Sequence, residues 1–295
     1  SIIIPCRLGT TTMAEGVEVK VLEHCLKSIR SSIPESDSHT LEFPPVEIVL
    51  VLNHENNPEE GQHLISYFDL KGVVVCDEPG FNFARKCNLG AQQSSGDILV
   101  FLNDDTDFQT IGWTSHVISL LQEDDVACVG GMLLNADGSV QSCGDNVGRN
   151  SAVHYVPKPS ASSVGDMMHR YIADHETTSI TGAFLCCKKD TFMTMDGFST
   201  TFPNSFQDVD FCLRARTKGL RCITSPHVRL LHFESASRNP EVDASTLWLI
   251  RKFHAVLMGQ VDPFAFYQYE KVRVPFFTLT SLRYHLSQLK RLVRR

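Results

Sequence analysis

Long apolar runs are missing from this 295-residue sequence. The longest, such as 98–102 and 46–52 with Glu47 inside it, have the length of β-strands, whereas a membrane-spanning helix needs about 20 apolar residues. The first residues, Ser-Ile-Ile-Ile-Pro, include neither a basic segment nor a cleavage site, so no signal peptide is predicted. An initiator methionine is also missing, which suggests excision from a longer protein. The composition, 42% hydrophobic and 21% charged, is that of a globular protein, and we expect it in the cytoplasm.

Cysteine spacing typical of metal sites is also absent. The ten cysteines include no Cys-x-x-Cys, and the one close pair is the adjacent Cys186 and Cys187. Structural zinc sites use regularly spaced ligands, so a zinc site is disfavoured. Cysteines scattered through apolar stretches are typical of buried, reduced thiols in a reducing compartment.

Positive charge is scarce outside the last 25 residues. The formal net charge of −7 argues against binding to nucleic acid. Residues 271–295 nevertheless hold seven Lys or Arg and no Asp or Glu. Apolar residues recur there at helical spacing from Leu282 to Val293, between the basic ones. This pattern predicts a basic amphipathic helix over 278–295, a candidate for contact with an anionic surface at the inner face of a membrane. The alternative is a helix packed on the rest of the protein.

Strand and helix signals alternate in the first half of the chain. Short β-branched runs predict strands at 1–5, 47–52, 73–76 and 98–102. Apolar residues at helical spacing predict helices over 19–29 and 83–91. The alternation indicates an α/β layer fold of Rossmann-like type, with a mostly parallel central sheet flanked by helices.

The second half of the chain is less regular. Strands are predicted over 126–134 and 181–188, and helices over 207–218, 244–258 and 278–294. Residues 150–178 are polar and predict an irregular excursion or loop.

Acidic and amide side chains gather directly after the most apolar strand. Asn103, Asp104, Asp105 and Asp107 follow the run 98–102, and open parallel sheets bind ligands at the carboxyl ends of their strands. Negative charges so close together are costly unless a cation neutralises them. Oxygen ligands suit Mg²⁺ or Mn²⁺, which bridge substrate phosphates. The alternative is a solvated acidic turn.

Two further polar segments offer acid–base and ligand chemistry. Asp208 and Asp210 lie at the start of the predicted helix 207–218, where the helix dipole favours an ionised carboxylate and would keep a general base deprotonated. Simple N-capping by Asp208 is the alternative. His232 follows an apolar run and is a candidate metal ligand or a core histidine. Arg238 is a candidate contact for a phosphate oxygen.

Taken in order, these segments resemble the family 2 glycosyltransferases of the GT-A fold, and most of all their O-antigen and rhamnosyltransferase-like branch. The matching stretches are 1–5, 81–90, 96–106, 181–183, 206–214 and 232–238. Any one of them is a weak signal, whereas the ordered set is specific. The resemblance implies a glycosyltransferase domain over 1–240, with a nucleotide-binding half at 1–107 and an acceptor and catalytic half at 108–240. A C-terminal helical extension would follow at 241–295.

The resemblance also implies roles for single residues. Asn103, Asp104 and Asp105 match the DxD-type motif with its first acid replaced by Asn. By this match Asp105 would bind the metal and Asp104 would lie near the donor ribose. His232 matches the late metal-ligand histidine, and Asp208 matches the base that deprotonates the acceptor hydroxyl. The residues implied at the nucleotide site are Pro5, Arg7, Asn53, Arg85, Asp97, Asn103, Asp104 and Arg238.

The implied activity is an inverting, metal-dependent transfer of one sugar from a nucleotide-sugar donor to a hydroxyl of a glycan or a lipid-linked saccharide. Mn²⁺ or Mg²⁺ would be the cofactor, and UDP-, dTDP- and GDP-sugars all stay open as donors. The Gln-x-x-Arg-Trp motif of processive synthases is absent, which favours single transfer over polymerisation.

Departures from the family pattern keep other functions open. The first strand is followed by Cys-Arg-Leu-Gly rather than by the usual Thr/Ser-Tyr-Asn type, and Asn53 stands where many relatives have Asp. Phe233 replaces the second histidine of the usual His-His-Glu-Ser. The Asn103 substitution allows a non-catalytic GT-A domain that binds sugar or nucleotide. Residues 4–10 also faintly resemble the start of sugar-activating cytidylyltransferases, so a nucleotidyltransferase is a third hypothesis.

Overall fold

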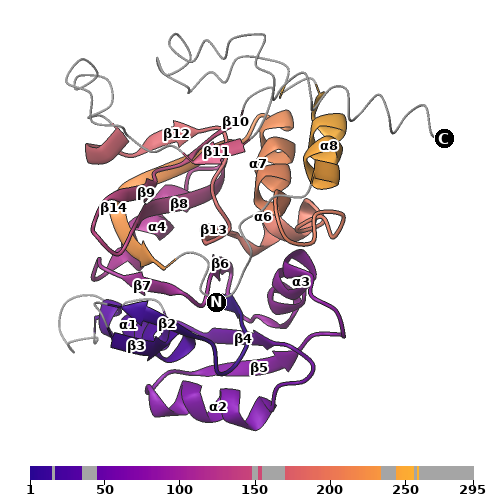
Figure 1. Ribbon diagram of the computed structural model, residues 1–295. Helices are drawn as coiled ribbons and strands as arrows, with labels where there is room; N and C mark the ends of the chain where they lie inside the picture. Colours follow the sequence, from indigo (N-terminus) through magenta and orange to yellow (C-terminus); the bar gives the residue numbers. More distant parts are fainter. Residues whose placement is uncertain are drawn as a thin grey trace, which may run out of the picture. The chain divides into compact units, whose positions relative to one another are not determined.

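The computed structural model describes residues 1–14, 17–34, 45–147, 152–154, 170–233, 244–255 and 258. The chain divides into two compact units, Ser1–Phe264 and Ala265–Arg295, and the described residues all belong to the first. A ten-stranded sheet with helices on both faces forms the centre of this unit (Figure 1). Arg238 and the helix predicted over 278–294 lie outside the described residues.

Four parallel strands make up the first half of the sheet. They are β1 (Ile2–Pro5), β4 (Ile48–Leu52), β5 (Gly72–Cys76) and β6 (Ile98–Leu102), in the spatial order β6-β1-β4-β5. The helices α1 (Val21–Ser32), α2 (Pro58–Tyr67) and α3 (Phe83–Gln93) lie between them in the chain. Because helices cover both faces of the sheet, β1 and β4 are apolar and buried along their whole length. All four predicted strands are confirmed.

Beyond β6 the sheet is mixed. Its other strands are β7 (Thr106–Phe108), β8 (Val126–Leu134), β9 (Val140–Ser142), β12 (His175–Thr177), β13 (Phe184–Lys188) and β14 (Arg221–His232). β13 pairs antiparallel with both β6 and β8, and β14 runs parallel to β8. β12 and β7 pair antiparallel with β14, and β9 pairs antiparallel with β8. The first half is therefore parallel, whereas β13 reverses the strand direction next to β6.

Two hydrophobic clusters hold the helices on the sheet. The other helices are α4 (Trp113–Leu121), α6 (Lys189–Thr194), α7 (Gln207–Thr217) and α8 (Ala244–Phe253). Side chains of α1, α2 and α4 share one cluster with the sheet, and those of α3, α6 and α7 share the other, on the opposite face (Figure 1). A third cluster joins α8 to α7 through Ile250, Phe206 and Val209.

Two small hairpins were not predicted from the sequence. β2 (Thr11–Ala14) pairs with β3 (Val17–Lys20), and β10 (Asp145–Val147) pairs with β11 (Ala152–His154). Val19 belongs to β3, so the prediction that the first helix begins at residue 19 was wrong, and α1 begins at Val21. The error arose because Val19 precedes Leu22 by three residues, which is helical spacing, although it continues the exposed strand before it.

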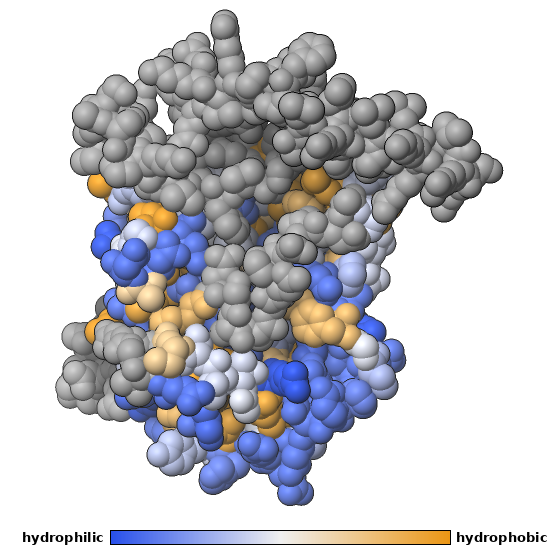
Figure 2. Space-filling view, viewed as in Figure 1, coloured by the Kyte–Doolittle hydropathy of each residue, from blue (hydrophilic) through white to orange (hydrophobic). Residues whose placement is uncertain are grey.

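Polar and apolar residues share the described surface that Figure 2 shows. Hydrophilic residues predominate in its lower part, with apolar residues between them. Large exposed apolar side chains come from separate elements, as with Tyr67 of α2, Met193 of α6 and Trp248 of α8. Within the described residues, no helix combines the length and apolarity that a membrane crossing requires.

Candidate active site

The strand ends bring several of the predicted nucleotide-site residues to one edge of the sheet. β1, β4 and β6 are adjacent and parallel, so their carboxyl ends lie side by side. Pro5 ends β1, Asn53 follows β4, and the turn 103–105 follows β6. The Asn53 Nδ2 group donates a hydrogen bond to Glu55 Oε1 at 2.9 Å. Such an edge is where α/β sheets bind ligands.

Asp104 is a buried carboxyl group at this edge. Its residue is only 7% exposed, and the Arg7 backbone hydrogen-bonds to its carboxylate. Arg7 thus contacts the acidic turn through its main chain, whereas its side chain is exposed. Burial raises the pKa of Asp104 to about 7, and the negative charge of Asp105 adds to the shift. A cation or hydroxyl donor at this position would favour the ionised carboxylate.

Two strand pairings bring His232 to Asp105. β7 begins directly after Asp105 and pairs antiparallel with the last residues of β14, so that Thr106 lies opposite His232. The next backbone N–H, that of Phe233, donates to the Asp105 carbonyl at 3.0 Å. Residues that are 127 positions apart in sequence are therefore neighbours through continuous backbone hydrogen bonding.

The His232 ring has three polar neighbours. Its Nδ1 lies 2.7 Å from Gln141 Oε1, and its Nε2 lies 3.2 Å from Asn103 Nδ2 and 3.2 Å from Asp105 Oδ1. The Nε2–Asp105 distance would be an ion pair only if the ring were protonated. Asp105 Oδ1 is buried and has no hydrogen-bond partner among the described residues, so we interpret the contact as two facing acceptors.

This pair of acceptors fits a divalent cation. A buried carboxylate oxygen without a hydrogen bond is normally costly, and a bound cation would satisfy it. A carboxylate oxygen is a ligand for either Mn²⁺ or Mg²⁺. A neutral imidazole nitrogen is a ligand for Mn²⁺, the softer of the two ions. Asp107, two residues on, points elsewhere and contacts His24 Nε2 at 3.1 Å.

Asp208 belongs to the same site through the strand next to β6. Its Oδ2 accepts a hydrogen bond from the Gly182 N–H at 2.6 Å, and its Oδ1 accepts one from the Val209 N–H at 2.8 Å. Ala183, which follows Gly182, accepts a hydrogen bond from the Asn103 N–H at 3.0 Å. The half-buried Asp208 carboxylate is therefore linked to the acidic turn through residues 182–183.

The start of α7 sets the direction of Asp208. Phe206 precedes the helix with φ +68°, in the left-handed region that a bulky residue seldom adopts. Its ring is buried with Val209 and Ile250, which holds this conformation. Asp210, in contrast, faces inward, where its oxygens contact Arg214 Nε and His254 Nε2, each at 2.8 Å. Asp210 thus anchors α7, while Asp208 stays at the site.

Of the remaining predicted nucleotide-site residues, Asp97 does not lie at this edge, whereas Arg85 lies there in an ion pair with Asp77, which follows the parallel strand β5. Asp97 precedes β6 and lies at its amino end, opposite to Asn103–Asp105, because a five-residue strand separates them. The Arg85 side chain forms a bidentate ion pair with the buried Asp77, with both N–O distances 2.8 Å. Arg85 also donates to the carbonyl of Glu78. The motif match did not show which end of β6 Asp97 occupies, and it did not show that Arg85 is paired with Asp77.

We expect Arg85→Lys to lower the free energy of unfolding by about 1–3 kcal/mol, because lysine cannot make the paired contact with the Asp77 carboxylate. Urea denaturation measures this loss. Arg30→Lys is the matched control, since Arg30 contacts Asp69 in an exposed pair worth at most about 1 kcal/mol. Weaker nucleotide binding by Arg85→Lys at unchanged stability would contradict the structural assignment.

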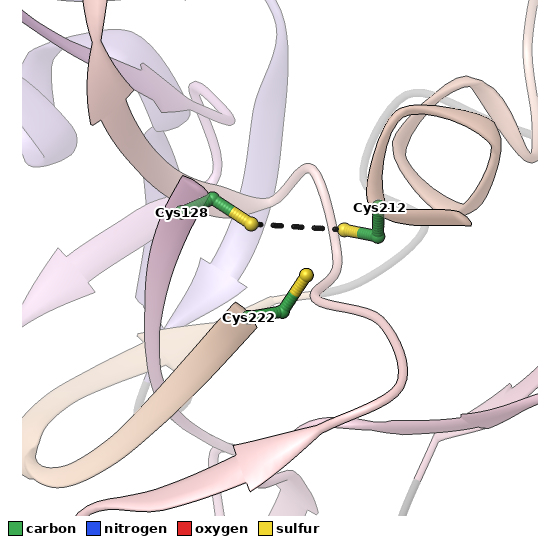
Figure 3. Close-up of side chains that lie close together, drawn as sticks. All are labelled: Cys128, Cys212 and Cys222. Atoms are coloured by element: carbon green, nitrogen blue, oxygen red, sulfur yellow. Dashed lines mark hydrogen bonds between the residues drawn. The ribbon is translucent and has the colours of Figure 1, made fainter. Parts of the chain in front are cut away.

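Three cysteines form a second group of side chains that are chemically able to bind a metal. The sulfur atoms of Cys128, Cys212 and Cys222 lie within 4.8 Å of one another, and all three side chains are buried (Figure 3). They come from β8, α7 and β14, so spacing along the chain does not reveal the group. Cys128 and Cys212 share a hydrogen bond at 3.8 Å. Because the group adds no fourth ligand from the described residues and has no exposed thiol, we interpret it as core packing.

Gln141 is the site residue that sequence reasoning missed. It lies on β9, just after the turn 135–138, and is 7% exposed. The sequence Asn-Ala-Asp-Gly at 135–138 is typical of a turn. What the signal does not show is that a hairpin there places a glutamine against His232.

Comparison with known proteins agrees with this geometry. The model of "Glycosyl transferase family 2" matches residues 1–154. The O-antigen biosynthesis protein RfbC of Myxococcus xanthus is 30% identical over 225 residues, which are 75% of this chain and 18% of that protein. Another match, the uncharacterized protein y4gI of Sinorhizobium fredii, is 29% identical over 59% of this chain and 19% of its own length. The chain thus spans about a fifth of these curated relatives.

Solved glycosyltransferase structures share the fold. The structure of GalNAc-T7 with UDP, GalNAc and Mn²⁺ has a TM-score of 0.56 at 14% identity and covers 71% of this chain and 42% of its own. The mannosyltransferase PcManGT from Pyrobaculum calidifontis, in complex with GDP-Man and Mn²⁺, has a TM-score of 0.54 at 16% identity and covers 89% and 65%. With the fold, the site geometry and the family match in agreement, the chain belongs to the family 2 glycosyltransferases and has the GT-A fold.

Proposed function

We propose that the chain transfers one sugar, with inversion, from a nucleotide-sugar donor to a hydroxyl of a glycan or lipid-linked saccharide. The observation that carries this proposal is the facing pair of Asp105 Oδ1 and His232 Nε2 at 3.2 Å, beside a strand end that suits a nucleotide. Mn²⁺ and nucleotide or nucleotide-sugar ligands occur together in the structures of GalNAc-T7 and PcManGT, which supports the same ligand classes here.

Asp105 and His232 would hold Mn²⁺ or Mg²⁺, and the ion would supply positive charge to the departing diphosphate. Asp104, Pro5, Asn53 and the Arg7 segment would surround the nucleoside, since they share the carboxyl edge of β1, β4 and β6. The Asn53 amide donates one N–H to Glu55, so its oxygen and its second N–H would be available to a base or ribose. Donor choice among UDP-, dTDP- and GDP-sugars thus depends on this pocket.

Asp208 would act as the general base. The acceptor hydroxyl gives its proton to the Asp208 carboxylate while its oxygen bonds to the anomeric carbon of the donor. The bond from that carbon to the diphosphate oxygen breaks, and the nucleoside diphosphate leaves with the electron pair. Backbone N–H groups of Gly182 and Val209 hold both carboxylate oxygens in place. Such fixed positioning supplies much of the rate in two-substrate reactions. A single displacement of this kind inverts the configuration.

The name of the relative RfbC, which assigns that protein to O-antigen biosynthesis, supports a proposal for the acceptor class. We propose a bacterial surface polysaccharide or its lipid-linked precursor as acceptor. Contact with an anionic membrane surface through residues 278–295 would suit a lipid-linked acceptor.

A thermal-shift panel of UDP, dTDP, GDP and CDP, each with and without Mn²⁺, tests the donor and metal parts of the proposal. A ligand that binds only the folded state adds about 2.7 kcal/mol of stability at a hundredfold excess over its Kd. We expect one nucleotide to raise the melting temperature, and only with Mn²⁺. No shift with any nucleotide would favour a non-catalytic GT-A domain, which the Asn103 substitution had left open.

A further inference from the structure

The geometry points to Gln141 as the positioning residue of His232: it holds the imidazole in one orientation and one tautomer, so that the Nε2 lone pair faces Asp105. This inference deepens the proposed function, because the orientation matters for a cation shared by Asp105 and His232. Gln141 touches neither substrate nor metal in this arrangement and acts through the histidine.

The Gln141 amide is itself fixed by its other contacts. Its Nε2 lies 3.3 Å from the His232 carbonyl oxygen and 3.3 Å from Asn135 Oδ1. A carbonyl oxygen only accepts hydrogen bonds, so the amide nitrogen has to face these two atoms and Oε1 has to face the ring. The backbone provides the same constraint, because β9 pairs with β8 and β8 pairs with the end of β14. Gln141 is thus held beside His232 at both its main chain and its side chain.

The fixed amide determines which ring nitrogen carries the proton. Gln141 Oε1 is an acceptor 2.7 Å from Nδ1, so a neutral His232 carries its proton on Nδ1 and donates it to Gln141. The lone pair is then on Nε2, directed at Asp105 Oδ1 and at Asn103 Nδ2, both 3.2 Å away. The Asn103 amide is a donor that satisfies this lone pair when no cation is bound. Asn103 occupies the position of the first acid of the usual DxD-type motif. A bound cation would displace its amide from Nε2.

Partners of metal-ligating histidines change metal affinity substantially when they are removed, typically by 10–100-fold. The expected result is specific to the acceptor oxygen of Gln141. Gln141→Met keeps a side chain of similar length but offers no oxygen to Nδ1, so the neutral ring is free to place its proton on Nε2 and lose the lone pair there. Gln141→Glu loses the amide donor to the His232 carbonyl and Asn135 but keeps an acceptor oxygen for Nδ1, so we expect it to retain the Nδ1–H tautomer.

Two measurements on the intact chain test the assignment. The first is ¹⁵N NMR of the metal-free protein with labelled histidine at pH about 8.5, where an ordinary histidine is neutral. The His232 signal is assigned among the 12 histidines by its loss in His232→Gln. The second is a Mn²⁺ titration followed by the EPR signal of free Mn²⁺. Gln207→Met is the matched control, because Gln207 is also a buried glutamine.

We expect the Nδ1–H tautomer in the wild type and in Gln141→Glu, and a shift toward Nε2–H in Gln141→Met. Mn²⁺ affinity should fall 10–100-fold in Gln141→Met and stay unchanged in Gln207→Met. An Nε2–H wild-type ring, or equal Mn²⁺ affinity of Gln141→Met and wild type, overturns the inference. If the wild type binds no Mn²⁺, the metal part of the proposed function fails, and the NMR result still decides whether Gln141 sets the tautomer.

Discussion

Replacing Asp208 with asparagine is expected to slow sugar transfer by about 10²–10⁴-fold, the usual contribution of a general base, while donor binding stays intact. Asparagine keeps the size of the side chain, and its oxygen still accepts from the Gly182 N–H, although its amide nitrogen cannot accept from the Val209 N–H as Oδ1 does. What is lost is the negative charge that takes the acceptor proton. In the proposed function, a nucleotide at the β1, β4 and β6 ends would not depend on that charge.

Donor hydrolysis measures this effect without knowledge of the acceptor. Water replaces the acceptor hydroxyl, and release of the nucleoside diphosphate is followed with the donor that the thermal-shift panel selects. Asp190→Asn is the matched control, because Asp190 is an exposed acid in the first turn of another helix, α6. Hydrolysis by Asp208→Asn at more than about a third of the wild-type rate would remove Asp208 from the role of base.

Replacing Asp105 with asparagine is expected to weaken Mn²⁺-dependent nucleotide binding by more than about 100-fold. Loss of a residue that only orients a ligand already costs 10–100-fold, and Asp105 would be a ligand itself. The carboxamide removes the charge that offsets the cation, although it has nearly the same shape. Of the two carboxylate oxygens of Asp105, the buried Oδ1, which has no hydrogen bond among the described residues, should contribute most to Mn²⁺ binding.

Isothermal titration of the selected nucleotide, with and without Mn²⁺, measures the change in affinity. Asp107→Asn is the matched control, since Asp107 is in the same turn but contacts His24 instead of His232. We expect Asp107→Asn to bind as the wild type does. Equal Mn²⁺-dependent affinity in Asp105→Asn and wild type would exclude Asp105 as a ligand and would leave His232 without its partner.

The parts of the site that lie at strand ends could be predicted from the sequence. Uninterrupted apolar runs identify β1, β4 and β6, and in a parallel sheet their carboxyl ends lie together. Pro5, Asn53 and Asp104, which the resemblance implied at the nucleotide site, accordingly lie at one edge. The direction of β6 excludes Asp97 from that edge for the same reason. A motif match takes no account of which end of the strand a residue occupies.

Contacts made by residues far apart in sequence could not be predicted in this way. Arg85 lies in a matching motif, yet its partner Asp77 is a buried acid at the end of β5 that no pattern singled out. The position of Gln141 against His232 depends on three strands pairing in a particular register. Periodicity reports which face of an element is buried, but it does not report which strands become neighbours.

One consequence follows from the order of elements between Asp208 and His232. The chain leaves the site along α7, turns at Gly219, and returns along β14, so residues 207–232 form one continuous helix–strand unit. Segments of this kind open and close cooperatively in native proteins, as hydrogen exchange shows. An opening of this single unit would withdraw the base and the histidine in the same event. A partly opened molecule would therefore have lost both chemical functions together, rather than retaining a damaged form of one of them.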